Sequence, residues 1–217
     1  EVMTVSWMYQ RDEVEITVRP EAESRPDITQ YSITVPPLEK VNTVLLLLRT
    51  MAFERTIIFC NTKAMCQRLS DDLRRAGVDA DCIHGDIAQQ KREKTMRTFK
   101  EGRLPVLIAT DVASRGIDVD DVDCVINYDV PQENEYYIHR IGRTGRAGES
   151  GAAYTFLSPD QLLDLREIEY HTHHLLETHD VEGFEYSEDR LVPNPKRPTK
   201  RASRSNRGRR RPSLRRR

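Results

Sequence analysis

The sequence predicts an α/β domain with a mostly parallel β-sheet that is covered by helices on both faces. Between residues 28 and 157, short apolar, β-rich runs alternate with longer segments of helical periodicity. A strand, a helix and a second strand in this rhythm form right-handed crossovers, which make the strands parallel. Runs such as Val106-Leu107-Ile108 are apolar throughout, as expected of a buried strand.

Each predicted element follows from this pattern in chain order. The strands are predicted near residues 28–35, 55–60, 79–83, 104–109, 123–128 and 151–157. The helices are predicted near residues 38–51, 62–76, 88–101, 133–142 and 159–177. In the second helix, Met65, Leu69 and Leu73 recur every four residues and share one apolar face. Thr62 is the predicted N-cap of this helix, and Gly77 is the predicted stop.

The last predicted helix has an apolar stripe of Leu162, Leu165 and Ile168 and several nearby histidines. His171 and His174 would share a helix face, but no cysteine or carboxylate partner at a recognised metal-binding position supports a metal site. We therefore predict no metal site and treat the histidines as surface positions: His171, His173, His174 and His179. The acidic run of Asp120, Asp121 and Asp123 is interpreted as a solvated turn.

Composition restricts the class of protein. The 217 residues suffice for one sizeable domain with extensions. No apolar run approaches the roughly 18 residues of a membrane span, and the N-terminus lacks a secretion pattern. These features favour a cytoplasmic protein with no membrane partner. No Cys-x-x-Cys pair occurs, so we expect reduced thiols, mostly in the core, at Cys60, Cys66, Cys82 and Cys124.

The formal net charge of −1 conceals a strong polarity along the chain. Residues 191–217 contain 12 Lys or Arg and no Asp or Glu, which leaves residues 1–190 with 22 basic and 35 acidic residues, a charge of −13. An acidic body must bind phosphate groups through a few placed arginines, whereas the basic tail favours a polyanion. The tail is poor in apolar residues, so we expect it to be largely disordered.

Polar residues follow several predicted strands. They are Asn61-Thr62, His84-Gly85-Asp86, Thr110-Asp111 and the segment after Tyr128. Ligands of open α/β sheets bind beyond the carboxyl ends of the strands, so these distant segments are expected to share one functional edge.

Residues 139–148 read His-Arg-Ile-Gly-Arg-Thr-Gly-Arg-Ala-Gly. This segment places arginines at positions 140, 143 and 146 among glycines at 142, 145 and 148. The planar guanidinium group matches phosphate oxygens, and glycine lets the backbone approach a ligand closely. The segment therefore predicts a phosphate site, with a flexible basic loop as the alternative.

Two further segments accompany this motif. Residues 109–118 read Ala-Thr-Asp-Val-Ala-Ser-Arg-Gly-Ile-Asp directly after an apolar run, and Gln89 and Arg92 lie three apart where a helix is predicted to begin. Together the three segments resemble the second, C-terminal RecA-like domain of the DEAD-box ATP-dependent RNA helicases, a superfamily-2 group. The resemblance runs from about residue 28 to 177 and implies a three-layer RecA-like fold.

The resemblance implies a nucleotide site shared with another domain. Arg143 and Arg146 would be arginine fingers that reach the γ-phosphate of ATP, where fixed cations stabilise the charge of the transferring group. Gly116 and Asp118 would contact the nucleotide, with the Asp118 carboxylate accepting a hydrogen bond from the ribose. ATP and Mg²⁺ would be held mainly by the first domain. A solvated basic turn and a capping aspartate are the alternatives.

The resemblance also implies contacts to the sugar-phosphate backbone of RNA, independent of base sequence. The matching positions are Asn61, Gly85, Gln89, Arg92, Thr110 and Arg115. For each of them taken singly, an ordinary surface position is the alternative. His139 and Arg140 would couple the arginine motif to the acidic box of the first domain, and a helix-capping histidine is the alternative.

The sequence lacks both Gly-x-x-x-x-Gly-Lys-Ser/Thr and Asp-Glu-Ala-Asp. We therefore expect this fragment alone neither to hydrolyse ATP nor to unwind RNA. Residues 9–18 resemble the end of the first helicase domain, although Glu13 stands where the family usually has proline. The expected organisation is a domain remnant and linker at 1–27, the RecA-like domain at 28–178 and an Arg-rich tail at 179–217.

The expected partners are RNA, the first RecA-like domain, and proteins of a ribonucleoprotein or degradosome type. Two other function classes stay open. Gly142-Arg143-Thr144-Gly145 satisfies the G-x-x-G loop of KH domains, which would make the chain a non-catalytic RNA-binding module. A DNA-directed superfamily-2 helicase domain is the second alternative.

Overall fold

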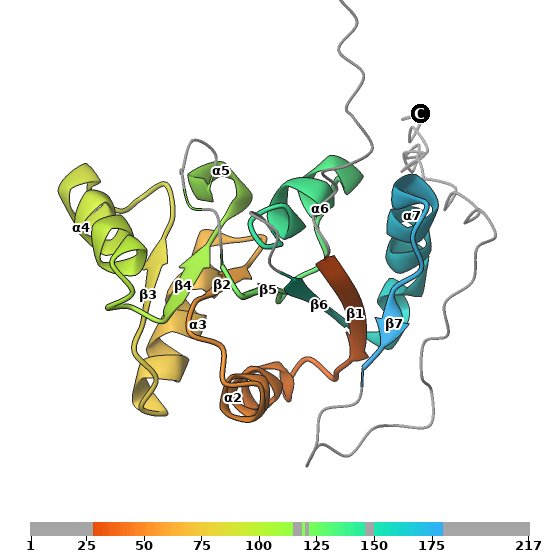
Figure 1. Ribbon diagram of the computed structural model, residues 1–217, viewed down its shortest axis with the longest axis horizontal. Coiled ribbons are helices and arrows are strands. Elements are labelled where there is room, and N and C mark those ends of the chain that lie inside the picture. Colours follow the sequence, from red (N-terminus) through yellow and green to blue (C-terminus); the bar gives the residue numbers. More distant parts are fainter. Residues whose placement is uncertain (1–27, 115–118, 120–121, 146–149, 180–217) are drawn as a thin grey trace, which may run out of the picture.

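A seven-stranded parallel sheet with helices on both faces forms the body of the protein (Figure 1). The structure is a computed structural model and describes residues 28–114, 119, 122–145 and 150–179. The strand order is β3-β4-β2-β5-β6-β1-β7, and every neighbouring pair is parallel. The predicted three-layer α/β fold is therefore confirmed.

The strands are short and mostly buried. Their bounds are β1 (Ile28–Thr34), β2 (Thr56–Phe59), β3 (Ala80–Ile83), β4 (Val106–Ala109), β5 (Cys124–Asn127), β6 (Gly151–Leu157) and β7 (Glu177–Thr178). The first six coincide with the predicted runs. Successive side chains alternate between two cores: Ile57 and Phe59 of β2 belong to one, and Ile58 belongs to the other.

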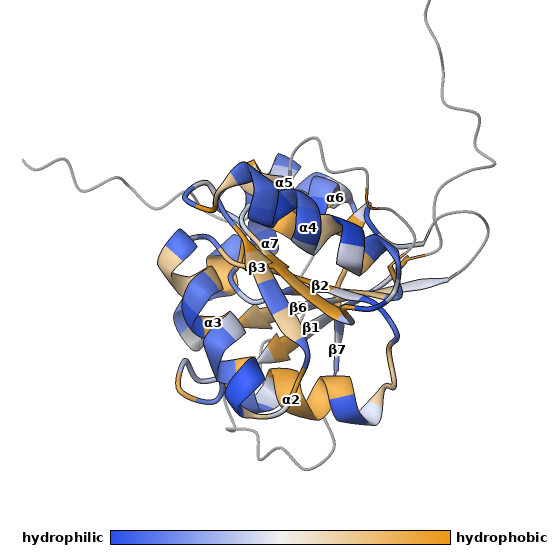
Figure 2. Cartoon of the chain, turned by 90° about the vertical axis from the view of Figure 1, so that its left-hand side faces the viewer, coloured by the Kyte–Doolittle hydropathy of each residue, from blue (hydrophilic) through white to orange (hydrophobic). Residues whose placement is uncertain are grey.

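The helices divide between the two faces of the sheet. Their bounds are α2 (Lys40–Thr50), α3 (Lys63–Arg75), α4 (Gln89–Lys100), α5 (Asp111–Ser114), α6 (Asn134–Ile141), the 3₁₀ turn η2 (Pro159–Gln161) and α7 (Leu162–Thr172). Helices α2 and α3 cover one face, and α4 to α7 lie on the other (Figure 1). Hydrophobic strands lie between helices that carry many hydrophilic residues (Figure 2).

Helix α3 begins and ends as its sequence predicts. The Thr62 hydroxyl accepts a hydrogen bond from the Met65 N–H at 3.1 Å, so Thr62 is the N-cap. Gly77 has a φ of +85°, a conformation that costs glycine little, and the Val78 N–H donates to the Leu73 carbonyl. The helix therefore stops where the chain must turn toward β3.

The predicted helix over residues 159–177 is too long. Helix α7 ends at Thr172, and His173 caps it in the left-handed conformation with a φ of +54°. The chain then turns so that Leu176 is buried and its N–H donates to the Glu169 carboxylate. Core burial and pairing of β7 with β1 thus override the helical pattern after Thr172.

The histidines near this turn differ in their surroundings. His171, His173 and His174 are exposed, as predicted. His179 is partly buried and its ring lies 4.9 Å from that of Tyr31, so its prediction as a surface position on the helix is wrong.

The four cysteines are free and buried, in agreement with the expected core thiols. None of the helices in the described part of the chain has the length and apolar character needed to cross a membrane.

Candidate functional site

Four neighbouring strands, β3, β4, β2 and β5, end at the same edge of the sheet. The segments that follow them carry the polar residues singled out from the sequence: Gly85 after β3, Thr110 after β4, Asn61 after β2 and Asp129 after β5. Since the strands are parallel, segments far apart in sequence share this carboxyl edge, as predicted.

Arg140 of α6 joins three of these segments. Its side chain is 1% exposed. Its Nε and Nη2 atoms donate to the two carboxylate oxygens of Asp111 at 2.6 and 2.7 Å. Nη2 also donates to Asn61 Oδ1 at 2.8 Å, and Nη1 donates to the Asp129 carbonyl at 2.8 Å. We call these four residues the Arg140 hub.

The hub is a paired charge in a largely buried setting. The two parallel bonds between Arg140 and Asp111 neutralise both charges and fix their orientation. The guanidinium carbon also lies 5.3 Å from the centroid of the Phe59 ring, which adds a cation–π contact. Such a buried pair is costly to break from one side, because the remaining charge loses its partner.

Two of the predicted RNA-binding residues have structural bonds within the domain. Asn61 donates its side-chain amide to the Val130 carbonyl at 2.8 Å while its Oδ1 accepts from Arg140. Thr110 is buried, and its hydroxyl accepts the Ala113 N–H at 3.4 Å at the start of α5. Both residues thus shape the edge in addition to any role toward RNA.

The remaining described positions of the predicted RNA set lie around α4. Arg92 donates to the Ala113 carbonyl at 2.8 Å and so ties α4 to the end of α5. Gln89 is exposed at the first residue of α4 and bonds to Glu93 at 2.8 Å. Gly85 is exposed in the segment before the helix.

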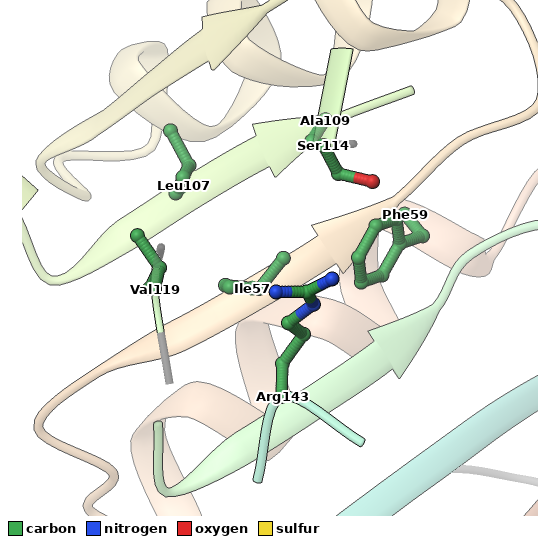
Figure 3. A pocket seen from close by; sticks show the side chains of 7 residues that line it. All are labelled: Ile57, Phe59, Leu107, Ala109, Ser114, Val119 and Arg143. Atoms are coloured by element: carbon green, nitrogen blue, oxygen red, sulfur yellow. The ribbon is translucent and has the colours of Figure 1, made fainter. Parts of the chain in front are cut away.

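Arg143 lines a small pocket on the face that α4 to α6 cover (Figure 3). The other lining residues are Ile57, Phe59, Leu107, Ala109, Ser114 and Val119. The guanidinium group of Arg143 lies over β2, between Ile57 and Phe59 (Figure 3). The Arg143 N–H also bonds to the Arg140 carbonyl at 3.2 Å, so the turn that carries Arg143 starts at the hub.

Several predicted site residues cannot be located. Arg115, Gly116, Asp118 and Arg146 lie outside the described residues. His139 is exposed on α6, next to the buried Arg140. Across the part of the chain that the structure describes, no group of three His, Cys, Asp or Glu side chains is arranged to hold a metal ion.

Sequence reasoning did not assign roles to Lys40, Asp111 and Asp129. Lys40 donates to the Tyr128 carbonyl at 2.8 Å and lies 3.5 Å from the Asp129 carboxylate. The other Asp129 oxygen accepts the Asn61 N–H at 3.1 Å. Asp111 and Asp129 could have been recognised because each lies just after an apolar strand. No feature of the sequence around Lys40 indicates that it lies beside Asp129.

The thiol of Cys60 precedes Asn61 and adds no charge to this edge. A hydrogen bond with Cys66 and burial raise the pKa of the Cys60 thiol well above its ordinary value. The thiol is therefore neutral at physiological pH, and the charges near Asn61 come from Arg140, Lys40 and the two aspartates.

Comparison with known proteins points to one family. Residues 39–148 match the family described as helicase conserved C-terminal domain. The chain is 42% identical over 162 residues to the DEAD-box ATP-dependent RNA helicase CshA of Geobacillus kaustophilus, covering 75% of this chain and 35% of that protein. The chain spans about a third of the length of the curated relatives it matches.

Two solved structures are similar over most of the domain. The Escherichia coli DEAD-box protein SrmB, bound to the regulator of ribonuclease activity RraA, superposes with a TM-score of 0.70 at 31% identity, covering 81% of this chain and 100% of that one. The C-terminal domain of the DEAD-box protein Dbp5 superposes with a TM-score of 0.66 at 33% identity, covering 70% and 90%.

Proposed function

This chain belongs to the DEAD-box RNA helicases as their C-terminal helicase domain, and from this membership we propose that its carboxyl edge joins half of an ATP site to half of an RNA site. In the intact protein a first RecA-like domain would hold ATP and Mg²⁺. This domain would supply cations to the γ-phosphate and contacts to the RNA backbone, and closure of the two domains would separate a short RNA duplex.

The Arg140 hub is the observation that carries this proposal. Within the hub, Arg140 bonds to Asn61 and Asp111, which lie at or beside the proposed RNA-facing positions, and the Arg140 carbonyl accepts the N–H of Arg143. A shift of the RNA-facing loops would therefore be transmitted through a packed, hydrogen-bonded element to the turn that carries the arginine. ATP and RNA are then expected to bind cooperatively.

For nucleotide, we propose that Arg143 and Arg146 act as the arginine fingers, and that Gly116 and Asp118 contact the nucleotide. The Arg143 side chain lies over the apolar surface of β2, so it would turn out of its pocket to reach a triphosphate. His139, exposed beside Arg140, is the proposed contact to the acidic box of the first domain.

For RNA, we propose that the charged and backbone donors of this edge bind sugar and phosphate groups. The proposed residues are Asn61, Gly85, Gln89, Arg92, Thr110 and Arg115. The 2′-hydroxyl groups would distinguish RNA from DNA. Competition between RNA and DNA of equal sequence for the intact protein tests this choice, and equal affinity would favour a DNA-directed or unselective helicase instead.

The finger assignment is tested by Arg143→Ala in the intact two-domain protein. We expect RNA-stimulated phosphate release to fall about 10³-fold, because such arginines stabilise charge that develops in the transition state. Arg103→Ala is the matched control, since Arg103 is an exposed arginine in the loop before β4, paired with Glu101. Phosphate release that is equal in the Arg143 variant and the control would exclude Arg143 as a finger.

A further inference from the structure

An exposed ion pair crosses the carboxyl edge. Lys63, the first residue of α3, places its Nζ atom 2.5 Å from the Asp86 carboxylate in the segment after β3. The two side chains are 55% and 67% exposed. Strand β4 lies between β2 and β3, so the pair joins the segments on either side of the strand that Thr110 follows.

Lys63 lies against the backbone of Gly85. A Cβ atom at Gly85 would be 3.4 Å from the Lys63 Cε and 3.5 Å from its Nζ. The ammonium group is thus held beside one of the proposed RNA contacts, and Asn61 is only two residues away in sequence. The first turn of α3 contains no acidic residue, so Lys63 pairs with a carboxylate of the other segment, that of Asp86.

An ion pair with this exposure is easily replaced. Exposed pairs contribute little to stability, since water competes for both charges. A phosphate group carries a full negative charge and releases counterions when it binds a lysine, so RNA competes well for the same ammonium group. An aspartate carboxyl is ionised at neutral pH, and the hydrogen bond with Lys63 lowers the pKa of Asp86 further.

We infer that Lys63 is a further RNA-contacting residue, and that Asp86 holds its ammonium group until an RNA phosphate displaces the carboxylate. The inference rests on the proposed function, because it requires RNA at this edge. The pair then has two opposite effects: Lys63 attracts the RNA backbone, while Asp86 competes with it. Before RNA binds, the Asp86 carboxylate keeps the Lys63 ammonium group beside Gly85.

The test measures the affinity of the intact two-domain protein for a short fluorescein-labelled oligouridylate by fluorescence anisotropy, with a non-hydrolysable ATP analogue present. Lys63→Ala should weaken binding about fivefold and reduce the slope of log affinity against log salt by about 0.7. Asp86→Asn should strengthen binding about two- to fivefold, because the competing carboxylate is gone while Lys63 remains.

The opposite signs distinguish competition from a structural role. Arg103→Ala and Glu101→Gln form the control pair, because Arg103 and Glu101 are also an exposed ion pair but lie in the loop that enters β4 at its other end. Unchanged affinity in both Lys63 and Asp86 variants, or a loss in both, would overturn the inference. A lack of RNA binding by the unaltered protein would instead contradict the proposed function.

Discussion

The side chain of Arg140 bonds within this domain, so its clearest effect is to position other residues. Three of its partners lie 79, 29 and 11 residues away along the chain: Asn61, Asp111 and Asp129. The sequence identified the cation and the polar loops, because both have strong local signals. It could not pair them, because pairing depends on which strands are neighbours and on how α6 packs over their ends.

Arg140→Met tests how much this hub contributes to the free energy of unfolding. The substitution keeps much of the apolar volume but leaves the Asp111 carboxylate, only 15% exposed, without its bidentate partner. The free energy of unfolding, measured by urea denaturation of the chain, should fall by about 3–5 kcal/mol. Arg103→Met should change it by less than about 0.5 kcal/mol, as for most surface positions.

A double variant separates the ion pair from simple loss of packing. Adding Asp111→Leu to Arg140→Met removes both charges, so the pair of substitutions should cost less than the sum of the two single ones. Additive costs would mean that Arg140 and Asp111 do not stabilise each other, and the hub would then be a set of independent contacts.

At the level of elements, the accuracy of the sequence prediction follows the strength of the local pattern. Buried parallel strands are apolar throughout, so runs such as 106–109 could be recognised from composition. Helix α5 has only four residues and β7 only two, too few to show a period. The end of α7 was misplaced because His173 adopts a left-handed conformation without the usual glycine signal.

The segment after α7 provides a matched pair of neighbours for a test. Leu176 is completely buried in the core, whereas the adjacent Leu175 is 44% exposed. Leu176→Ala should lower the free energy of unfolding by about 2–5 kcal/mol, since it removes a buried side chain and leaves a cavity. Leu175→Ala should change it by less than about 1 kcal/mol in the same denaturation experiment. Equal effects would show that the turn does not anchor β7 to the core.

On the scale of the whole molecule, the proposed function requires a small number of placed cations. Residues 1–190 have a formal charge of −13, so this body has no general attraction for nucleic acid. The described cations of the carboxyl edge are positioned by bonds to neighbouring loops, as for Arg92 with Ala113 and Lys63 with Asp86. Residues 191–217 carry 12 basic residues, and we expect them to add salt-sensitive, sequence-independent affinity for RNA.

The proposed sharing of the ATP site between two domains predicts how the chain behaves by itself. The sequence contains no phosphate-loop motif, and the proposed site supplies cations but not the loop and carboxylates that hold ATP with Mg²⁺. The purified 217-residue chain should therefore release phosphate from ATP at the rate of buffer, with or without RNA. Release should appear only when the chain is joined to its first domain, and it should then require Arg143. RNA-stimulated release by the chain alone, still present after further purification, would show that a complete nucleotide site exists here and that the shared-site mechanism is incorrect.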